Sequence, residues 1–262
     1  MNRKCHEQFA RWFRSHCASF YTDVADDQRN ILLKEEHTHR VCDNMNILTE
    51  SLGLPENDRL LAAAVALFHD VGRFEQYQKY RTFKDSASEN HAALGARILA
   101  GDDVLRELPS EERNTVIRAV TLHNVYHVPD GLSERDLFFL RLIRDADKLD
   151  IWRVFIEYYA LPPEERASAV GLGFADIPEC SPALVEALAR REMVNLSLVQ
   201  TLNDFKLLQL SWVYDLNFPV SLRQFRERGY LESMEALLPQ APDVARALQS
   251  LRDFMLEKME RS

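Results

Sequence analysis

Hydrophobic residues recur every three or four positions along most of this chain, the spacing that places them on one face of an α-helix. The alternation of polar and hydrophobic residues that is typical of strands is scarce, and the 262 residues include only eight glycines. The pattern predicts helices over or beginning at residues 5–20, 28–52, 55–73, 90–100, 109–127, 133–159, 182, 195–214, 219 and 242. We therefore expect an all-α fold, with a helical core and additional C-terminal helices.

The segment LLAAAVALFHDVGR, residues 60–73, is apolar along almost its whole length, so as a helix it would be buried on nearly every side. Its last turn places His69 and Asp70 in this dry environment. A buried carboxylate is normally paired with a cation or bound to a metal ion, because burying it alone is costly. Gly72 follows, where we expect a left-handed helix cap. Residues 74–88 are weakly patterned and predict an ordered loop over the helix end.

The helix predicted over residues 28–52 carries two histidines, and the hydrophobic pattern distinguishes them. Steps of three or four residues from His37 reach Val41 and further apolar residues, which form a core-facing stripe. The same steps from His39 reach polar residues such as Glu50, which belong to a solvent-facing surface. A metal site between helices is built from inward-facing side chains. His37 is therefore predicted to point inward and His39 to lie on the surface.

Three more polar side chains lie on predicted core-facing stripes. His91 shares a helix face with Ile98, and His123 shares one with Val120. Asp147 lies on the apolar stripe of the long helix predicted near the middle of the chain. An aspartate is rarely buried without a partner, so its position favours a functional or paired carboxylate.

The composition excludes several classes of protein. A net charge of -9 argues against a nucleic-acid partner. The N-terminus is too polar for a signal peptide, and no apolar run reaches the roughly 18 residues of a membrane span. Four scattered cysteines, without the CxxC spacing, indicate neither a zinc knuckle nor a disulfide framework. We expect a cytoplasmic protein with no membrane partner.

Four imidazoles and two carboxylates are thus predicted to face inward: His37, His69, Asp70, His91, His123 and Asp147. Such donors suit manganese, iron, zinc or a related divalent ion better than calcium. Six donors exceed the needs of one tetrahedral zinc, whereas with Asp70 as a bridge they fit two ions about 3.5–4 Å apart. From the residues alone, His–Asp pairs without a metal stay an open alternative.

Three motifs occur in order along the chain: HTHRV at residues 37–41, FHDVGR at 68–73 and ADKLD at 146–150. In this order they resemble the HD-domain superfamily of metal-dependent phosphohydrolases, and the resemblance extends over residues 28–160. His91 and His123 match two further histidines of a subgroup with a dinuclear centre. The resemblance implies one ion surrounded by His37, His69, Asp70 and Asp147, and a second ion held by Asp70, His91 and His123.

The resemblance implies hydrolysis of a phosphate ester or phosphoanhydride in a nucleotide or another small phosphorylated metabolite. A hydroxide bound to the two metals would be the nucleophile, so Asp70 is expected to be essential for catalysis. Arg73 and Lys148 are adjacent to ligands and either hold the substrate phosphate or form surface ion pairs. Asp85 either orients His91 by a hydrogen bond or caps the helix that follows.

We expect a single helical domain over residues 1–262, with a core at 28–160 and an extension at 161–262 packed on it. Two other functions are compatible with this sequence. Some proteins of this fold use the same six ligands for a di-iron centre that oxidises a C–H bond with oxygen. Others bind a nucleotide and signal without turnover, but loss of ligands would mark such a regulatory module, and all six are present here.

Overall fold

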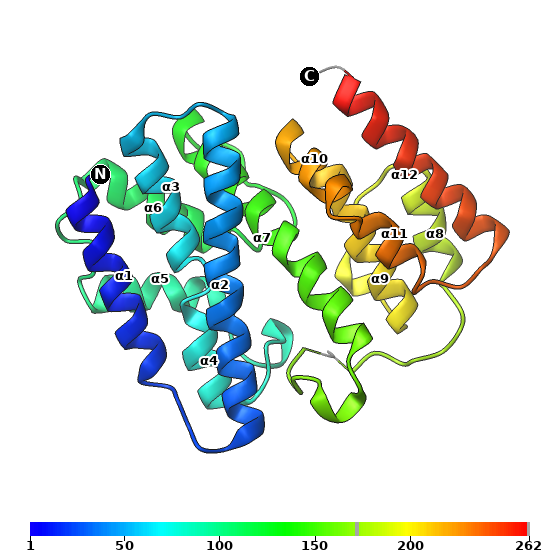
Figure 1. Cartoon of the computed structure of the whole chain (residues 1–262), viewed down its shortest axis with the longest axis horizontal. Helices are drawn as coiled ribbons and strands as arrows, with labels where there is room; N and C mark the ends of the chain where they lie inside the picture. Colours follow the sequence, from blue (N-terminus) through cyan, green and yellow to red (C-terminus); the bar gives the residue numbers. More distant parts are fainter. Residues whose placement is uncertain (171–172, 261–262) are drawn as a thin grey trace. The chain divides into compact units, whose positions relative to one another are not determined.

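The computed structural model describes residues 1–170 and 173–260, which form helices and no strand (Figure 1). This confirms the predicted all-α class. The described chain divides into two compact units, residues 1–151 with 161–170 and residues 152–160 with 173–260. That the two units form a single domain stays a prediction. None of the described helices combines the length and apolar character needed to cross a membrane.

Helix α3 (Glu56–Phe68) is the most deeply buried helix of the first unit. Every residue from Leu61 to Phe68 is buried, because its alanines allow neighbouring helices to approach closely. The helices packed against it are α1 (Arg3–Ala18), α2 (Ala25–Ser51) and α6 (Ser110–Leu122). On α1, the ring of Phe9 meets that of Phe68 edge to face, with centroids 5.3 Å apart. The end of α3 is therefore fixed from several sides.

Local sequence signals set several helix boundaries as predicted. Helix α2 ends before Gly53, which has a φ of +63° that favours glycine. Pro55 immediately precedes α3, and Pro109 immediately precedes α6. Ser133 precedes α7 (Glu134–Ala160), and its hydroxyl accepts a hydrogen bond from the backbone N–H of Asp136. The first unit also contains η1 (Asp85–Ala87), α5 (His91–Gly101) and η2 (Pro163–Glu165).

The loop predicted over residues 74–88 was wrong for its first part, because residues 74–80 belong to a helix, α4 (Gly72–Tyr80). Four of its residues are buried, namely Gly72, Phe74, Gln76 and Tyr77. The Gln76 amide donates to Asp85 Oδ1 at 2.8 Å, to Ser88 Oγ at 2.9 Å and to the carbonyl oxygen of Glu89 at 2.8 Å. Contacts with residues further along the chain therefore stabilise this helix, and its own hydrophobic pattern does not reveal it.

Gly72 also has a different role from the left-handed cap predicted for it. It begins α4 and is absent from the residues with positive φ. A Cβ atom at Gly72 would lie 2.2 Å from the carbonyl oxygen of His91 and 2.6 Å from the backbone nitrogen of Gly95. Glycine is thus needed because α4 and α5 pack backbone against backbone at this point.

The second unit is built around residues 152–160 of α7 and the later helices. These are α8 (Pro182–Ala189), η3 (Leu196–Leu198), α9 (Leu202–Ser211), η4 (Trp212–Asp215), α10 (Pro219–Glu227), α11 (Tyr230–Glu235) and α12 (Pro242–Glu260). Trp152 is fully buried, and its Nε1 donates to the carbonyl oxygen of Gln209 at 3.0 Å. The helix predicted from residue 195 begins later, because Thr201 and Asp204 form a capping box.

Candidate metal centre

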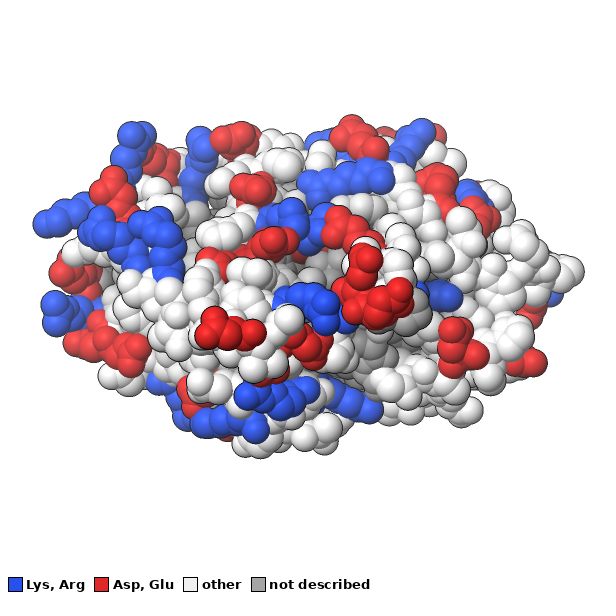
Figure 2. Space-filling view, turned by 60° about the horizontal axis from the view of Figure 1, so that its bottom comes forward, with Lys and Arg blue, Asp and Glu red and all other residues white. Residues whose placement is uncertain are grey.

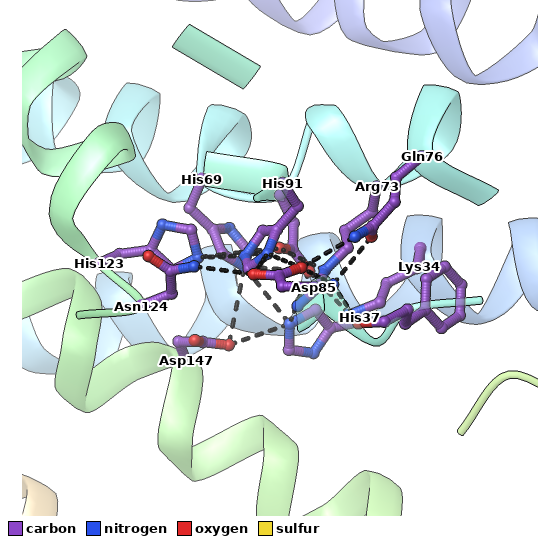
Figure 3. A network of polar contacts seen from close by, with 12 residues as sticks. Lys34, His37, His69, Arg73, Gln76, Asp85, His91, His123, Asn124 and Asp147 are labelled. Carbon is purple, nitrogen blue, oxygen red and sulfur yellow. Dashed lines mark hydrogen bonds and ion pairs between the residues drawn. The ribbon is translucent and has the colours of Figure 1, made fainter. Parts of the chain in front are cut away.

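The six side chains predicted as metal ligands lie together within the first unit (Figure 3). They are His37 on α2, His69 at the end of α3, Asp70 before α4, His91 at the start of α5, His123 at the end of α6 and Asp147 on α7. Five of them are at most 5% exposed, and 14% of the Asp147 side chain is exposed. Residues from five segments of the chain thus meet in a buried polar cluster.

The two histidines at helix ends are oriented by the helices themselves. His69 Nδ1 lies 2.7 Å from the carbonyl oxygen of Ala66, and His123 Nδ1 lies 2.8 Å from that of Val120. A carbonyl oxygen only accepts hydrogen bonds, so each Nδ1 carries the proton and donates it. In each neutral ring the lone pair is then on Nε2, the atom that points into the cluster.

Carboxylates orient the other two imidazoles. His37 Nδ1 lies 2.7 Å from Asp150 Oδ2, and His91 Nδ1 lies 2.8 Å from Asp85 Oδ2. Of the two roles considered for Asp85, the contact with His91 is present, and the cap of α5 is Asn90 instead. A histidine that binds a metal through Nε2 usually donates its other N–H to such a group. All four rings thus have Nδ1 occupied and Nε2 directed at the cluster.

The carboxylate of Asp70 faces two separate groups of imidazoles. Its Oδ2 lies 3.6 Å from His37 Nε2 and 3.8 Å from His69 Nε2. Its Oδ1 lies 3.3 Å from His91 Nε2 and 3.8 Å from His123 Nε2. Asp70 therefore belongs to two sets of three donors, and one oxygen is available to each set.

The donor spacing fits metal ions. The Nε2 atoms of His37 and His69 are 3.3 Å apart, and those of His91 and His123 are 3.0 Å apart. Two nitrogens bound at right angles to one ion, each about 2.1 Å from it, would be separated by about 3 Å. In addition, Asp147 Oδ1 is buried without a hydrogen bond, although it lies 3.0 Å from His37 Nε2. A cation would satisfy this oxygen.

The imidazoles of His91 and His123 are neutral at pH 7. Burial, reinforced by the positive charge of Arg73, lowers the pKa of His91 to about 4. Burial, reinforced by His69, likewise lowers the pKa of His123 to about 4. Only the neutral ring has a lone pair for a metal, so both histidines are in the binding form over the whole physiological pH range.

The half of the cluster around His37 and Asp147 carries more charge than the half around His91 and His123. Burial and Lys34 lower the pKa of His37, but the carboxylates of Asp147 and Asp150 outweigh both and raise it to about 8. Burial raises the pKa of Asp70, yet the nearby cations, Lys34 foremost, hold it well below the ordinary range. The metal-free centre therefore contains ionised carboxylates that a divalent ion would neutralise.

Sequence reasoning missed two residues at this centre. Lys34 Nζ donates to Asp70 Oδ2 at 2.8 Å, and Asp150 orients the ring of His37. Each lies three residues from a ligand on the same helix, Lys34 from His37 and Asp150 from Asp147. Residues three apart on a helix lie on the same face, so this spacing was the signal in the sequence that could have placed both residues at the centre.

The other predicted residues have different positions. Arg73 Nε lies 3.4 Å from Asp70 Oδ1, so the predicted cation does lie beside this carboxylate. One terminal nitrogen of Arg73 donates to the carbonyl oxygen of Phe83 at 2.6 Å. Lys148 is buried on α7, and its contact with a substrate stays a prediction. His39 is exposed beside the ring of Phe13, as expected of a surface residue.

Comparison with known proteins identifies one family. The HD domain family model matches residues 35–152, and all six predicted ligands lie within this range. Searches of curated proteins and of solved structures gave no match. The matched region begins two residues before His37 and ends two residues after Asp150. Residues 35–152 of this chain are therefore an HD domain.

Proposed function

We propose that the HD domain of this chain is a two-metal phosphohydrolase. Its substrate would be a phosphate ester or phosphoanhydride in a nucleotide or another small phosphorylated metabolite, within the cytoplasm. The observation that carries this proposal is Asp70, whose two oxygens each face a different pair of imidazoles. Enzymes that hydrolyse phosphate esters commonly hold two ions about 3.5–4 Å apart, and a shared carboxylate favours that spacing.

Bound divalent ions would supply an acidified water as nucleophile and would neutralise charge on the phosphoryl oxygens. The residues of the chain hold the site in shape. Asp85 and Asp150 keep the rings of His91 and His37 aimed at the cluster. Arg73 is 15% exposed beside Asp70, so its guanidinium can donate to a phosphoryl oxygen. Lys148 is a second candidate for a contact with a phosphoryl oxygen.

A small anionic substrate agrees with the charge of the protein. Basic and acidic side chains are interspersed on the face in Figure 2, and the net charge is -9. Nucleic-acid binding requires many phosphates to be neutralised by lysine and arginine. A metal centre, in contrast, reverses the field only locally and can attract one phosphate group. We therefore propose a small phosphorylated substrate and neither a nucleic acid nor a membrane as partner.

The test is metal content combined with a screen of phosphate esters and anhydrides. Protein purified without oxygen should contain two divalent ions per chain and release inorganic phosphate from one substrate class. Asp70→Ala should lose both ions and the activity, because the bridge serves both donor sets. Asp43→Ala, which removes an exposed carboxylate of α2, is the control and should retain both.

Other results would contradict the proposal. Two ions retained in Asp70→Ala would exclude a dinuclear site bridged by that residue. Two irons with a mixed-valent paramagnetic signal, together with oxygen-dependent substrate oxidation and no phosphate release, would assign a di-iron oxygenase. Nucleotide binding without any metal under all loading conditions would assign a regulatory module.

A further inference from the structure

Lys34 lies against the bridging carboxylate but is not completely enclosed. Its Nζ is 2.8 Å from Asp70 Oδ2, and 15% of its side chain is exposed. The ring of Phe83 lies 5.2 Å from Nζ and 5.9 Å from the guanidinium carbon of Arg73. Figure 3 shows Lys34 and Arg73 on the side of the centre away from His123. Two cations therefore flank Asp70 with an aromatic ring beside both.

The contact between Lys34 and Asp70 competes with the binding of a metal ion at the same oxygen. The same Oδ2 faces the Nε2 atoms of His37 and His69, so an ion held by these donors would take this oxygen. A divalent ion and an ammonium group within a few ångströms of each other repel strongly in a buried site. Filling the site therefore weakens the ion pair of Lys34 with its carboxylate.

Arg73 and Lys34 differ in the contacts that they keep when a metal ion binds Asp70. Arg73 still donates to Asp85 Oδ1 at 3.1 Å and to the Phe83 carbonyl oxygen. Among the described residues, Asp70 provides the one carboxylate that lies within ion-pair distance of Lys34. A lysine ammonium whose carboxylate is engaged elsewhere needs another anion, since leaving a partly buried charge unpaired is costly.

We propose that in the metal-loaded protein Lys34 binds a phosphoryl oxygen of the substrate. This rests on the proposed function and goes beyond it by assigning a substrate contact that the sequence motifs do not indicate. The ammonium is a compact charge with three donors on a flexible stem, so it can turn from Asp70 to an incoming anion. The ring of Phe83 stabilises it at the edge of the centre.

Lys34→Met tests the proposal through two binding measurements that need no turnover. Inorganic phosphate should bind the metal-loaded variant about 10 to 100 times more weakly than the unchanged protein, the usual cost of losing a charged hydrogen bond. The first divalent ion should bind the metal-free variant more tightly, because no ammonium competes for Asp70 Oδ2. Titration calorimetry measures both, and Lys34→Arg should restore most of the phosphate affinity.

The control is Lys79→Met, which removes an exposed lysine on α4 that pairs with Glu75 and should change neither affinity. Unfolding midpoints confirm that each variant is folded. Unchanged phosphate binding in Lys34→Met would overturn the proposal, as would weaker metal binding, which would make Lys34 a residue that only positions Asp70. Phosphate binding lost in Lys148→Met instead would move the contact to Lys148. A metal-loaded unchanged protein that neither binds phosphate nor hydrolyses any ester would refute the proposed function itself.

Discussion

His37 and His39 are two positions apart on α2, yet they lie in opposite environments. His37 is 2% exposed, and its Nε2 faces the carboxylates of Asp70 and Asp147. His39 is exposed, with its ring 5.9 Å from that of Phe13. We expect His37→Ala to lower the metal content by at least one ion per chain and His39→Ala to leave it unchanged. Elemental analysis after identical loading measures this, and the reverse result would show that His39 is the ligand.

At the scale of single residues, helical periodicity predicted the inward position of the histidines but not the contacts of Lys34 and Asp150. An apolar stripe identifies His37 and His123 because their neighbours along the stripe are hydrophobic. Lys34 and Asp150 lie one turn from ligands, but charged residues at that spacing are also typical of solvent-exposed helix faces. Their role depends on which side chain of another helix they meet, and the sequence does not contain that information.

At the scale of helices, the sequence predicted elements whose boundaries have local causes and missed α4. Pro55 and Gly53 mark boundaries through their own backbone preferences. Helix α4 depends instead on Gln76, whose amide bonds three groups beyond the helix. The close approach at Gly72 likewise involves α5, and no local pattern reveals which helices touch.

Gly72→Ala should damage the fold and one half of the centre together. The new Cβ would lie 2.2 Å from the carbonyl oxygen of His91, and a backbone atom cannot move aside as a flexible side chain can. We expect a loss of about 1–3 kcal/mol in the free energy of unfolding, typical of overpacking. The start of α5 would shift, so the ion held by Asp70, His91 and His123 should bind more weakly.

Denaturant titration and metal analysis measure these two effects of Gly72→Ala. Gly101→Ala is a matched control in α5, because a Cβ there would meet no atom within 4 Å. Its free energy of unfolding should stay within about 1 kcal/mol of the unchanged protein. Equal stability and equal metal content in the two variants would contradict the close packing of α4 on α5.

A carboxylate at the start of α7 should make the free energy of unfolding decrease at acid pH. Asp136 is 5% exposed and accepts hydrogen bonds from Thr115 Oγ1 and Ser133 Oγ, both at 2.8 Å, and from Arg118. Burial raises the pKa of Asp136, but these donors outweigh burial and lower it. A lowered pKa in the folded state stabilises the protein above the unfolded pKa of about 3.9, and this contribution is lost as the pH falls further.

Asp136→Asn should therefore cost about 1–3 kcal/mol of unfolding free energy at pH 7. The difference from the unchanged protein should shrink as the pH falls below about 4, because the aspartate then becomes neutral as well. Urea titrations at several pH values measure the difference. Asp130→Asn removes an exposed carboxylate close by in sequence and controls for the change in net charge. If the difference in unfolding free energy did not change with pH, the cost of Asp136→Asn would come from the altered shape of the side chain and not from its lost charge.

At the scale of the whole molecule, the sequence indicated a core that ends at residue 160 but not where the compact units divide. The division falls between residues 151 and 152, inside α7, and residues 161–170 return to the first unit. A continuous helix has no local signal where its contacts change from one unit to another. Trp152 illustrates this, since its indole bonds Gln209 of a much later helix.

Removal of metal should destabilise only one of the two units. All six candidate ligands lie in the first unit, and an ion that binds only folded protein stabilises it by about 2.7 kcal/mol at a free concentration of 100 times its Kd. Chelation should therefore speed amide hydrogen exchange in α3, α5 and α6, whose ends carry ligands, and leave α8 to α12 unchanged. Mass spectrometry of loaded and chelated protein measures this by segment. Equal loss of protection in both units would show that they unfold together, and no change in α3 would show that the metal does not stabilise the buried helix that ends at His69.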